Sequence, residues 1–355
     1  MTIRAAVIGA SFAKAAYLPA MRTQPDVEVV AIASARLSSA QAVAAEFGIP
    51  HAYDDWRKML DSHELDLVGV VTPTVYHAPA VLAALDRGAH VICEKPMAMN
   101  ADEARQMYER AESLKRVHLI GHELRFNPNR RKIHHLIAEG YIGKIRHINI
   151  VNISTTWGDP ASRPAGDWWS DAAMGGGRLG ANGSHQIDLL RFWAGEIGAV
   201  TGQVLTIVPD RRDKVTGQAW TATADDTVNF TAEFTNGGFA QVFLSGVARH
   251  GVGNSVQIYG SEGTIRLADA DEKLWVARAG EDFVDMSETD PNAALPGIGK
   301  GIWNVSFVAL MAEACAAIRE DRRTAWGATF ADGLRCQIVM DGIRQAWAER
   351  RWVTV

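Results

Sequence analysis

The sequence predicts an α/β protein, with a doubly wound parallel sheet in its N-terminal part and an α+β domain built on a large, open, mainly antiparallel sheet after it. Over the first 120 residues, short apolar runs alternate with segments of helical periodicity, which favours parallel strands joined by crossover helices. After residue 123, strand-like segments and hairpin-type turns dominate. We therefore expect two domains, 1–123 and 124–355, with the last helix a candidate for packing back on the first domain.

Five apolar runs of the N-terminal part are typical of strands buried on both faces: AAVIGA (5–10), VEVVAIAS (27–34), LDLVGVVT (65–72), HVICEK (90–95) and VHLIGH (117–122). Helices are expected between them at 38–48, 78–88 and 101–114. Gly48 and Gly88 stand where two of these helices should stop. Asn100 and Glu103 have the spacing of a capping box at the start of the third helix.

The C-terminal part predicts a helix that ends at Gly140, and then mostly strands. The strands are expected at 145–155, 227–235, 239–247, 255–260 and 264–268, with turns at 235–239 and 260–264 and further helices near 184–194, 303–319 and 328–348. The segment 157–177 is long, aromatic and glycine-rich, which is more typical of a ligand-binding loop than of a simple connection.

Composition excludes several classes of function. The net charge is −5 and no run is rich in Lys or Arg, so we expect no nucleic-acid partner. No apolar stretch approaches the roughly 20 residues that a bilayer requires, so we expect no membrane partner. Cys93, Cys315 and Cys336 match no zinc or redox spacing, which predicts reduced thiols, no metal and a cytoplasmic location.

The stretch AAVIGASFAK runs from the first strand into a turn with the slots of a dinucleotide-binding G-x-G-x-x-G. Gly9 is in place, and Ser11 is the next smallest residue after glycine, with a hydroxyl that can donate to phosphate. Phe12 and Ala13 open the helix whose backbone N–H groups would face the anion. Lys14 stands at the third glycine position of the motif, where it cannot provide the close helix–strand packing of a glycine. From these residues alone, a cofactor site and an ordinary strand–helix connection both stay open.

The end of the second strand bears on the choice of cofactor. NAD-binding proteins usually carry an acid here for the ribose 2′-hydroxyl, but this chain offers Ser34 and Arg36, with no acid before Glu46. Serine and arginine would hold a 2′-phosphate by charge-assisted hydrogen bonds. If a dinucleotide binds, the sequence favours NADP(H) over NAD(H). The alternative for Arg36 is a solvated charge beyond a strand.

Two further motifs carry a resemblance to a known family. The chain has T-P-x-x-x-H at Thr72, Pro73 and His77, and E-K-P at Glu94 to Pro96. With GHELRFNP, AEGYIGKI, GGGRLGANGSHQIDLLRFWAG, VQIYGSEGTIRL and the C-terminal helix, it resembles the glucose–fructose oxidoreductase/inositol dehydrogenase/rhizopine-catabolism (Gfo/Idh/MocA) family over essentially its whole length. Because family members with a G-A-S opening bind cofactor, the resemblance implies a Rossmann domain with a functional turn.

The resemblance implies an NAD(P)-dependent oxidoreductase that acts on a secondary alcohol or ketone of a sugar, polyol or related cyclic compound. Lys95 would stabilise the developing alkoxide, His185 would act as general acid/base, and Asp188 would orient His185 or bind substrate. The implied cofactor-binding residues are Gly9, Ser11, Phe12, Ala13, Ser34, Arg36, Thr72, Pro73, His77, Glu94 and Lys95.

The substrate side departs from the family pattern. Many members carry Asp four residues before the histidine, where this chain has Ala181; Asn182 beside it can donate a hydrogen bond but brings no charge. This departure weakens any transfer of substrate identity. The candidate substrate-binding residues are Lys95, Glu123, Trp157, Arg163, Trp168, Asn182 and His185, with core or interface packing as the alternative for the tryptophans and a structural role expected for Arg125.

Two other functions fit the same fold. One is a non-catalytic regulator that senses cofactor or sugar, although the presence of both Lys95 and His185 disfavours it. The other is a redox-neutral enzyme with tightly bound cofactor. The resemblance also implies a homodimer or homotetramer formed through the C-terminal sheet, and the alternating pattern at 227–246 suits a sheet with one face to cover.

Overall fold

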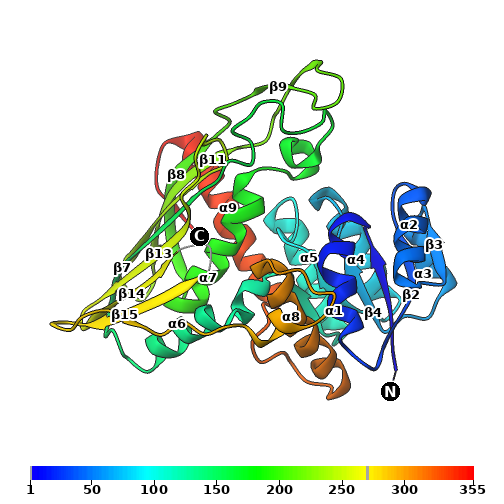
Figure 1. Ribbon diagram of the computed structural model, residues 1–355, viewed down its shortest axis with the longest axis horizontal. Helices are drawn as coiled ribbons and strands as arrows, with labels where there is room; N and C mark the ends of the chain where they lie inside the picture. The colour runs from blue at the N-terminus through cyan, green and yellow to red at the C-terminus, as the bar shows by residue number, and fades with distance from the viewer. Residues whose placement is uncertain (1, 269–271) are drawn as a thin grey trace. The chain divides into compact units, whose positions relative to one another are not determined.

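The computed structural model describes residues 2–268 and 272–355 (Figure 1). Its contacts divide the chain into two compact units. Unit 1 comprises Met1–Asn127 and Thr289–Arg335, and unit 2 comprises Pro128–Glu288 and Cys336–Val355. The segment 289–335 thus groups with unit 1, whereas the sequence analysis assigned it to the second domain. The compact units are defined by contacts and not by which part folds on its own, so the predicted domain boundary at 123/124 stays a prediction.

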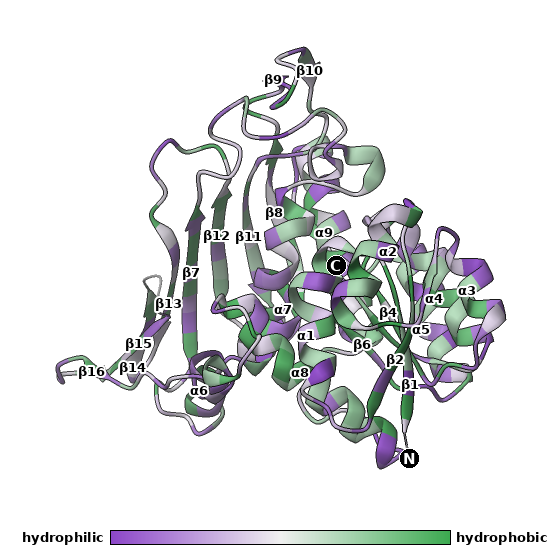
Figure 2. Cartoon of the chain, turned by 45° about the vertical axis from the view of Figure 1, so that its right-hand side comes forward, coloured by the Kyte–Doolittle hydropathy of each residue, from purple (hydrophilic) through white to green (hydrophobic). Residues whose placement is uncertain are grey.

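Unit 1 is built on a six-stranded parallel sheet of order β3-β2-β1-β4-β5-β6. The strands are β1 (Ile3–Ile8), β2 (Val27–Ala33), β3 (His51–Tyr53), β4 (Leu67–Val70), β5 (His90–Cys93) and β6 (His118–Ile120). Figure 2 shows β1 and β4 largely in the hydrophobic colour, as expected for strands covered on both faces. The doubly wound parallel sheet is confirmed, and its strand order reverses between β1 and β4, where such sheets bind ligands.

Helices connect these strands. Residues 11–22 form one helical run, made of η1 (a π-helix, Ala13–Tyr17) and α1 (Leu18–Arg22). The others are α2 (Leu37–Phe47), α3 (Trp56–Ser62), α4 (His77–Asp86) and α5 (Ala101–Ser113), with 3-10 turns η2 (Thr74–Tyr76) and η3 (Glu123–Phe126). Gly48 follows α2 with φ of 62°, which confirms it as the end of that helix. The Asn100 side chain accepts the N–H of Glu103, which confirms the predicted cap at the start of α5.

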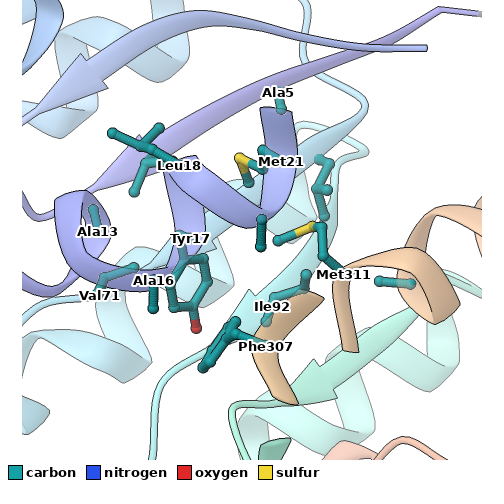
Figure 3. Packing of buried hydrophobic residues seen from close by; sticks show 14 of the residues in the cluster. Ala5, Ala13, Ala16, Tyr17, Leu18, Met21, Val71, Ile92, Phe307 and Met311 are labelled. Carbon is teal, nitrogen blue, oxygen red and sulfur yellow. The ribbon is translucent and has the colours of Figure 1, made fainter. Parts of the chain in front are cut away.

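The segment that returns to unit 1 carries η7 (Pro291–Ala294) and α8 (Ile302–Arg319). Phe307, Leu310, Met311 and Ala314 of α8 join the hydrophobic core around Tyr17 (Figure 3). Among the described helices, α8 alone has the length and apolar composition of a membrane span. Since its apolar residues pack in this core, we interpret α8 as a core helix.

Unit 2 contains a nine-stranded mixed sheet of order β16-β15-β14-β13-β7-β12-β11-β8-β17. Among the strand pairs of this sheet in the described residues, β12–β7 alone is parallel, so the large, mainly antiparallel sheet is confirmed. The strands are β7 (Ile145–Ile153), β8 (Ile197–Leu205), β11 (Thr227–Phe234), β12 (Phe239–Ser245), β13 (Gly253–Gly260), β14 (Gly263–Ala268), β15 (Lys273–Arg278), β16 (Val284–Asp285) and β17 (Val353–Thr354).

One face of this sheet is covered by helices of unit 2. These are α7 (Ser184–Ala194) and residues 336–349 of α9 (Phe330–Glu349), while α6 (Pro128–Ala138) precedes β7 (Figure 1). Along β12, Ala240, Val242 and Leu244 are buried and the residues between them are exposed. A two-stranded hairpin, β9 (Asp210–Arg212) and β10 (Ala219–Thr221), lies apart from the large sheet in the topology. The three cysteines are buried, and none of them forms a disulfide with another described residue.

Candidate functional site

The carboxyl ends of the parallel strands gather most of the predicted cofactor residues at one edge of unit 1. Gly9 follows β1, Ser34 follows β2, Thr72 lies just beyond β4, and Glu94 and Lys95 follow β5. The backbone continues the sheet pairing there, since Gly9 N–H donates to Ala33 O at 2.8 Å and Glu94 N–H to Val70 O at 2.9 Å. The strand-order reversal between β1 and β4 falls within this group.

Gly9 is fixed by a close backbone approach. Its φ is +114°, and a Cβ atom at this position would lie 2.1 Å from the carbonyl oxygen of Val71. No residue with a side chain fits without moving the end of β4. The first glycine of the turn therefore has the tight geometry that a dinucleotide turn requires.

The helix after the turn begins with groups suited to an anion. Its first backbone bond runs from Lys14 N–H to Ala10 O, so the N–H groups of Ser11, Phe12 and Ala13 precede the helical ladder. Ser11 is exposed and Phe12 half-buried, while Ala13 is fully buried. Lys14 turns to the surface, where its ammonium lies 2.6 Å from the Glu46 carboxylate.

Ser34 and Arg36 lie beyond β2 without a carboxylate between them. Ser34 is half-buried, and its N–H donates to Tyr53 O of β3 at 3.0 Å. Arg36 is the exposed residue at the N-terminal end of α2. Both side chains are therefore carried at the edge where the ribose of a dinucleotide would extend from the turn.

The Thr72–His77 segment supplies a buried polar atom. Thr72 Oγ1 is buried and has no hydrogen-bond partner within residues 2–268 and 272–355. The His77 ring lies between two carbonyl oxygens, Thr72 O at 2.9 Å from Nε2 and Pro96 O at 3.0 Å from Nδ1. Burial lowers the pKa of His77, against the opposing effect of these two carbonyls, and the neutral ring has one N–H to donate to one of them. The unpaired hydroxyl and the close approach at Gly9 both fit a bound nucleotide.

Lys95 is half-buried, and the neighbouring Glu94 is buried. Burial raises the pKa of the Glu94 carboxyl to about 7, against the opposing effect of the Lys95 ammonium. The phenol of Tyr17 donates to this carboxyl at 3.2 Å. Sequence reasoning missed Tyr17, because an aromatic residue in an apolar helix is read as core.

Glu123 and Arg125 lie on η3. Glu123 is 1% exposed, which removes its carboxyl from solvent. Arg125 pairs with Asp332 at 3.1 Å, and the other carboxylate oxygen of Asp332 accepts the backbone N–H of Thr329. Arg125 therefore ties η3 to the start of α9, in agreement with the structural role expected for it.

In unit 2, His185 and Asp188 lie one turn apart on α7, and each is 1% exposed. A π-helical segment, η6 (Leu179–Gly183), leads directly into α7. Asn182 in this segment is buried, and its Oδ1 accepts Gln186 Nε2 at 3.4 Å. The segment thus holds Asn182 and His185 on consecutive helical turns within this unit.

Asp225 fixes the start of this helical segment. Its carboxylate accepts the Leu179 N–H at 2.7 Å, and its carbonyl accepts the Arg178 N–H at 2.8 Å. At Gly177, where φ is +114°, a Cβ atom would lie 2.3 Å from Asp225 Oδ1, so the glycine run makes room for this carboxylate. Burial raises the pKa of Asp225. No short motif marked Asp225, since its partners lie about 46 residues away in the sequence.

The aromatic loop contains three of the predicted substrate residues. Trp157 is 3% exposed and packs on Gly246, where a Cβ atom would lie 2.4 Å from the indole. Arg163 is half-buried and lies 3.5 Å from Asp167. Trp168 is half-buried and stacks on Trp169 with ring centroids 4.0 Å apart. Trp168 and Arg163 thus keep exposed surface, whereas Trp157 is closed in by its own unit.

Comparison with known proteins matches both units. Residues 3–122 match the family described as "Oxidoreductase family, NAD-binding Rossmann fold", and residues 130–266 match the GFO/IDH/MocA C-terminal domain. Levoglucosan dehydrogenase of Pseudarthrobacter phenanthrenivorans is 29% identical, over 91% of this chain and 88% of its own length. D-glucoside 3-dehydrogenase of Escherichia coli K12 is 31% identical, over 66% of this chain and 68% of its own length.

A solved structure matches the whole chain as well. Levoglucosan dehydrogenase in complex with NADH and levoglucosan superposes with a TM-score of 0.89 at 26% identity, covering 100% of this chain and 99% of that one. That agreement in fold extends over both compact units.

Proposed function

We propose, on the premise that the chain belongs to the GFO/IDH/MocA family of oxidoreductases, that it is an NADP(H)-preferring dehydrogenase of sugars, polyols or related cyclic compounds. The reaction would interconvert a secondary alcohol and its ketone. The observation that carries the proposal is the edge of unit 1 where the tight turn at Gly9, the unpaired Thr72 hydroxyl and Lys95 follow neighbouring strands. The named activities of two relatives, on levoglucosan and on D-glucosides, support the substrate class.

The proposed chemistry assigns a role to each polar group. When bound, the nicotinamide accepts or returns a hydride. Lys95 donates a hydrogen bond to the reacting oxygen and stabilises its negative charge. His185 takes up the hydroxyl proton in the oxidative direction, and Asp188, one turn further along α7, orients it. Substrate contacts are proposed for Glu123, Arg163, Trp168 and Asn182, whereas Trp157, which is 3% exposed and packs on Gly246, is assigned the packing role that was its alternative.

The proposed coenzyme preference rests on Ser34 and Arg36. An acid at the end of β2 would repel a 2′-phosphate, whereas this chain offers a hydroxyl and an exposed guanidinium. Lys14 is a matched control: it is an exposed cation on the cofactor helix, but its ammonium is paired with Glu46. The solved relative is a complex with NADH. A preference for NADPH in this chain would therefore come from its own residues and not from a property shared with that relative.

Titration with NADPH and NADH, followed by tryptophan fluorescence, tests this preference. The wild type should bind NADPH at least about tenfold more tightly, because a charge-assisted bond contributes about 1.5–3 kcal/mol. Arg36→Ala should lose this advantage and leave NADH binding unchanged, while Lys14→Ala should bind both coenzymes as the wild type does. Equal affinities in the wild type, or the same loss in both variants, would refute the preference.

We further propose that the exposed face of the unit 2 sheet pairs copies of the chain into a homodimer or homotetramer. Phe239, Phe243 and Trp275 are between 37% and 41% exposed on it. His147 stacks between Phe239 and Tyr259, at 5.7 and 4.6 Å. Apolar rings in such numbers on one face favour burial against a partner. A monomer mass in sedimentation at all concentrations would contradict this assembly.

A further inference from the structure

The two oxygens of the buried Glu94 carboxyl have different partners in unit 1. Oε1 accepts the hydroxyl of Tyr17 at 3.2 Å, and Oε2 accepts the backbone N–H of Lys95 at 3.2 Å. One carboxyl therefore joins the helical run that follows the dinucleotide turn to the residue that carries the proposed substrate-binding ammonium. The link is short: Tyr17 lies eight residues after Gly9 in the chain.

The Tyr17 ring is held from several sides, so its hydroxyl points in one direction. The ring is fully buried and packs on Gly69 of β4, where a Cβ atom would lie 3.1 Å from it. Phe307 of α8 lies against the ring at 4.6 Å between centroids, and Figure 3 shows the two side by side. Phe12, from the turn itself, meets Tyr17 edge-on at 6.4 Å.

The carboxyl is confined from the other side by β6. A Cβ atom on Gly121, directly after this strand, would lie 2.5 Å from Glu94 Oε1. The Gly121 N–H donates to Cys93 O at 2.8 Å, which holds this wall in place. Glycine at position 121 therefore leaves the room beside β6 that Glu94 Oε1 occupies, and a residue with a side chain there would collide with the carboxyl.

Burial and the neighbouring groups together determine the pKa of the Glu94 carboxyl. Burial raises the pKa of Glu94 to about 7, while the Lys95 ammonium and the Tyr17 hydrogen bond lower it. Burial and the neighbouring Glu94, Cys93 and Glu123 raise the pKa of Tyr17 well above its ordinary value. Burial likewise raises the pKa of the Cys93 thiol. Tyr17 is thus a permanent donor, and Glu94 is the group of this set that changes charge near neutrality.

We propose that Tyr17 is a positioning residue for Lys95, which it holds in register with the dinucleotide turn through the carboxylate of Glu94. The inference rests on the proposed function in treating Lys95 as the group that contacts substrate. Removing the phenolic hydroxyl leaves the ring packing intact but frees one side of the carboxyl, so the backbone at Lys95 loses an anchor. A displacement of this kind lowers turnover more than it lowers coenzyme affinity.

The test compares Tyr17→Phe with Phe307→Leu. The first removes only the hydroxyl, and the second loosens the packing of the same ring but keeps the hydroxyl. Tyr17→Phe should lower kcat roughly tenfold with a change of less than about twofold in the NADPH dissociation constant. It should also move the acidic limb of the pH–rate profile to higher pH, because the ionised carboxyl loses a donor. Phe307→Leu should lower the melting temperature and leave the pH midpoint in place.

A second measurement needs no sugar turnover. The infrared carboxyl band that disappears in Glu94→Gln is titrated in the unloaded wild type and in Tyr17→Phe, from about pH 5 to about pH 9. An upward shift of its midpoint in Tyr17→Phe supports the inference even if no sugar is oxidised, a result that would count against the proposed function alone. An unchanged midpoint, wild-type kcat in Tyr17→Phe, or equal pH shifts in Tyr17→Phe and Phe307→Leu would each overturn the positioning role.

Discussion

At the scale of single residues, His90 shows how one buried bond fixes a protonation state. Its Nδ1 accepts the backbone N–H of Val117 at 2.8 Å, which requires the neutral ring. Burial, with a smaller effect from Arg116, lowers the pKa of His90 from 6.5 to about 4. The folded state therefore resists protonation of this ring, whereas the unfolded chain does not.

This difference predicts that the free energy of unfolding decreases as the pH is lowered through a defined window. Because the folded pKa lies below the unfolded one, the contribution of His90 is fully present above about pH 6.5 and is lost as the pH falls toward 4. After discounting for partial exposure, the loss is on the order of 1–2 kcal/mol. His90→Asn keeps an acceptor but removes the titrating ring, so urea unfolding should show a shallower pH slope over this window. Parallel curves for variant and wild type would contradict this.

Residues in local motifs could be proposed from the sequence, and residues with distant partners could not. Gly9, Lys95 and His185 each stand in a short motif, so the sequence alone was enough to propose them as site residues. Tyr17 was missed because its polar partner lies 77 residues along the chain, and Asp225 was missed for the same kind of reason. A sequence pattern shows that an aromatic residue is apolar, but not where its hydroxyl points.

At the scale of elements, the start of α5 combines two reciprocal caps. Asn100 Oδ1 accepts the Glu103 N–H at 2.9 Å, and Glu103 Oε2 accepts the Met99 N–H at 3.0 Å. Together they satisfy two backbone donors at the entrance to a thirteen-residue helix.

Asn100→Ala should therefore lower the free energy of unfolding by about 1 kcal/mol. Asn100→Asp, which keeps an acceptor, serves as the control and should stay within about 0.5 kcal/mol of the wild type. Denaturant unfolding measures both variants. If Asn100→Ala were as stable as Asn100→Asp, the cap would contribute nothing to the fold.

Elements with strong periodicity or end signals were predicted well, while two strands with weak signals, β3 and β8, were missed. The strands β1, β2, β4 and β5 are apolar runs, and α5 carries its own cap. By contrast, β3 has three residues, and β8 contains two glycines and is half-buried along most of its length. The sequence of β8 has no clear strand pattern, and its hydrogen-bonded pairing with β11 and β17 stabilises it as a strand.

At the scale of the whole molecule, the chain leaves unit 1 at Asn127 and returns to it from Thr289 to Arg335. No composition shift marks this return, so the sequence analysis assigned α8 to the C-terminal part. The segment is tied to unit 1 by apolar packing on Tyr17 and by Arg319, which pairs with Asp26 at 2.8 Å. The fold class and family were predictable from the sequence, because motifs in a fixed order extend over both units.

The most direct test of the central claim is turnover of cyclic sugars and polyols with NADP⁺, followed by the absorbance of the reduced coenzyme. The account predicts oxidation of at least one such compound. It also predicts that Lys95→Met loses at least about a hundredfold in kcat while binding NADPH within about twofold of the wild type. An enzyme that oxidises no compound of this class with either coenzyme, or a Lys95→Met variant with wild-type turnover, would contradict it.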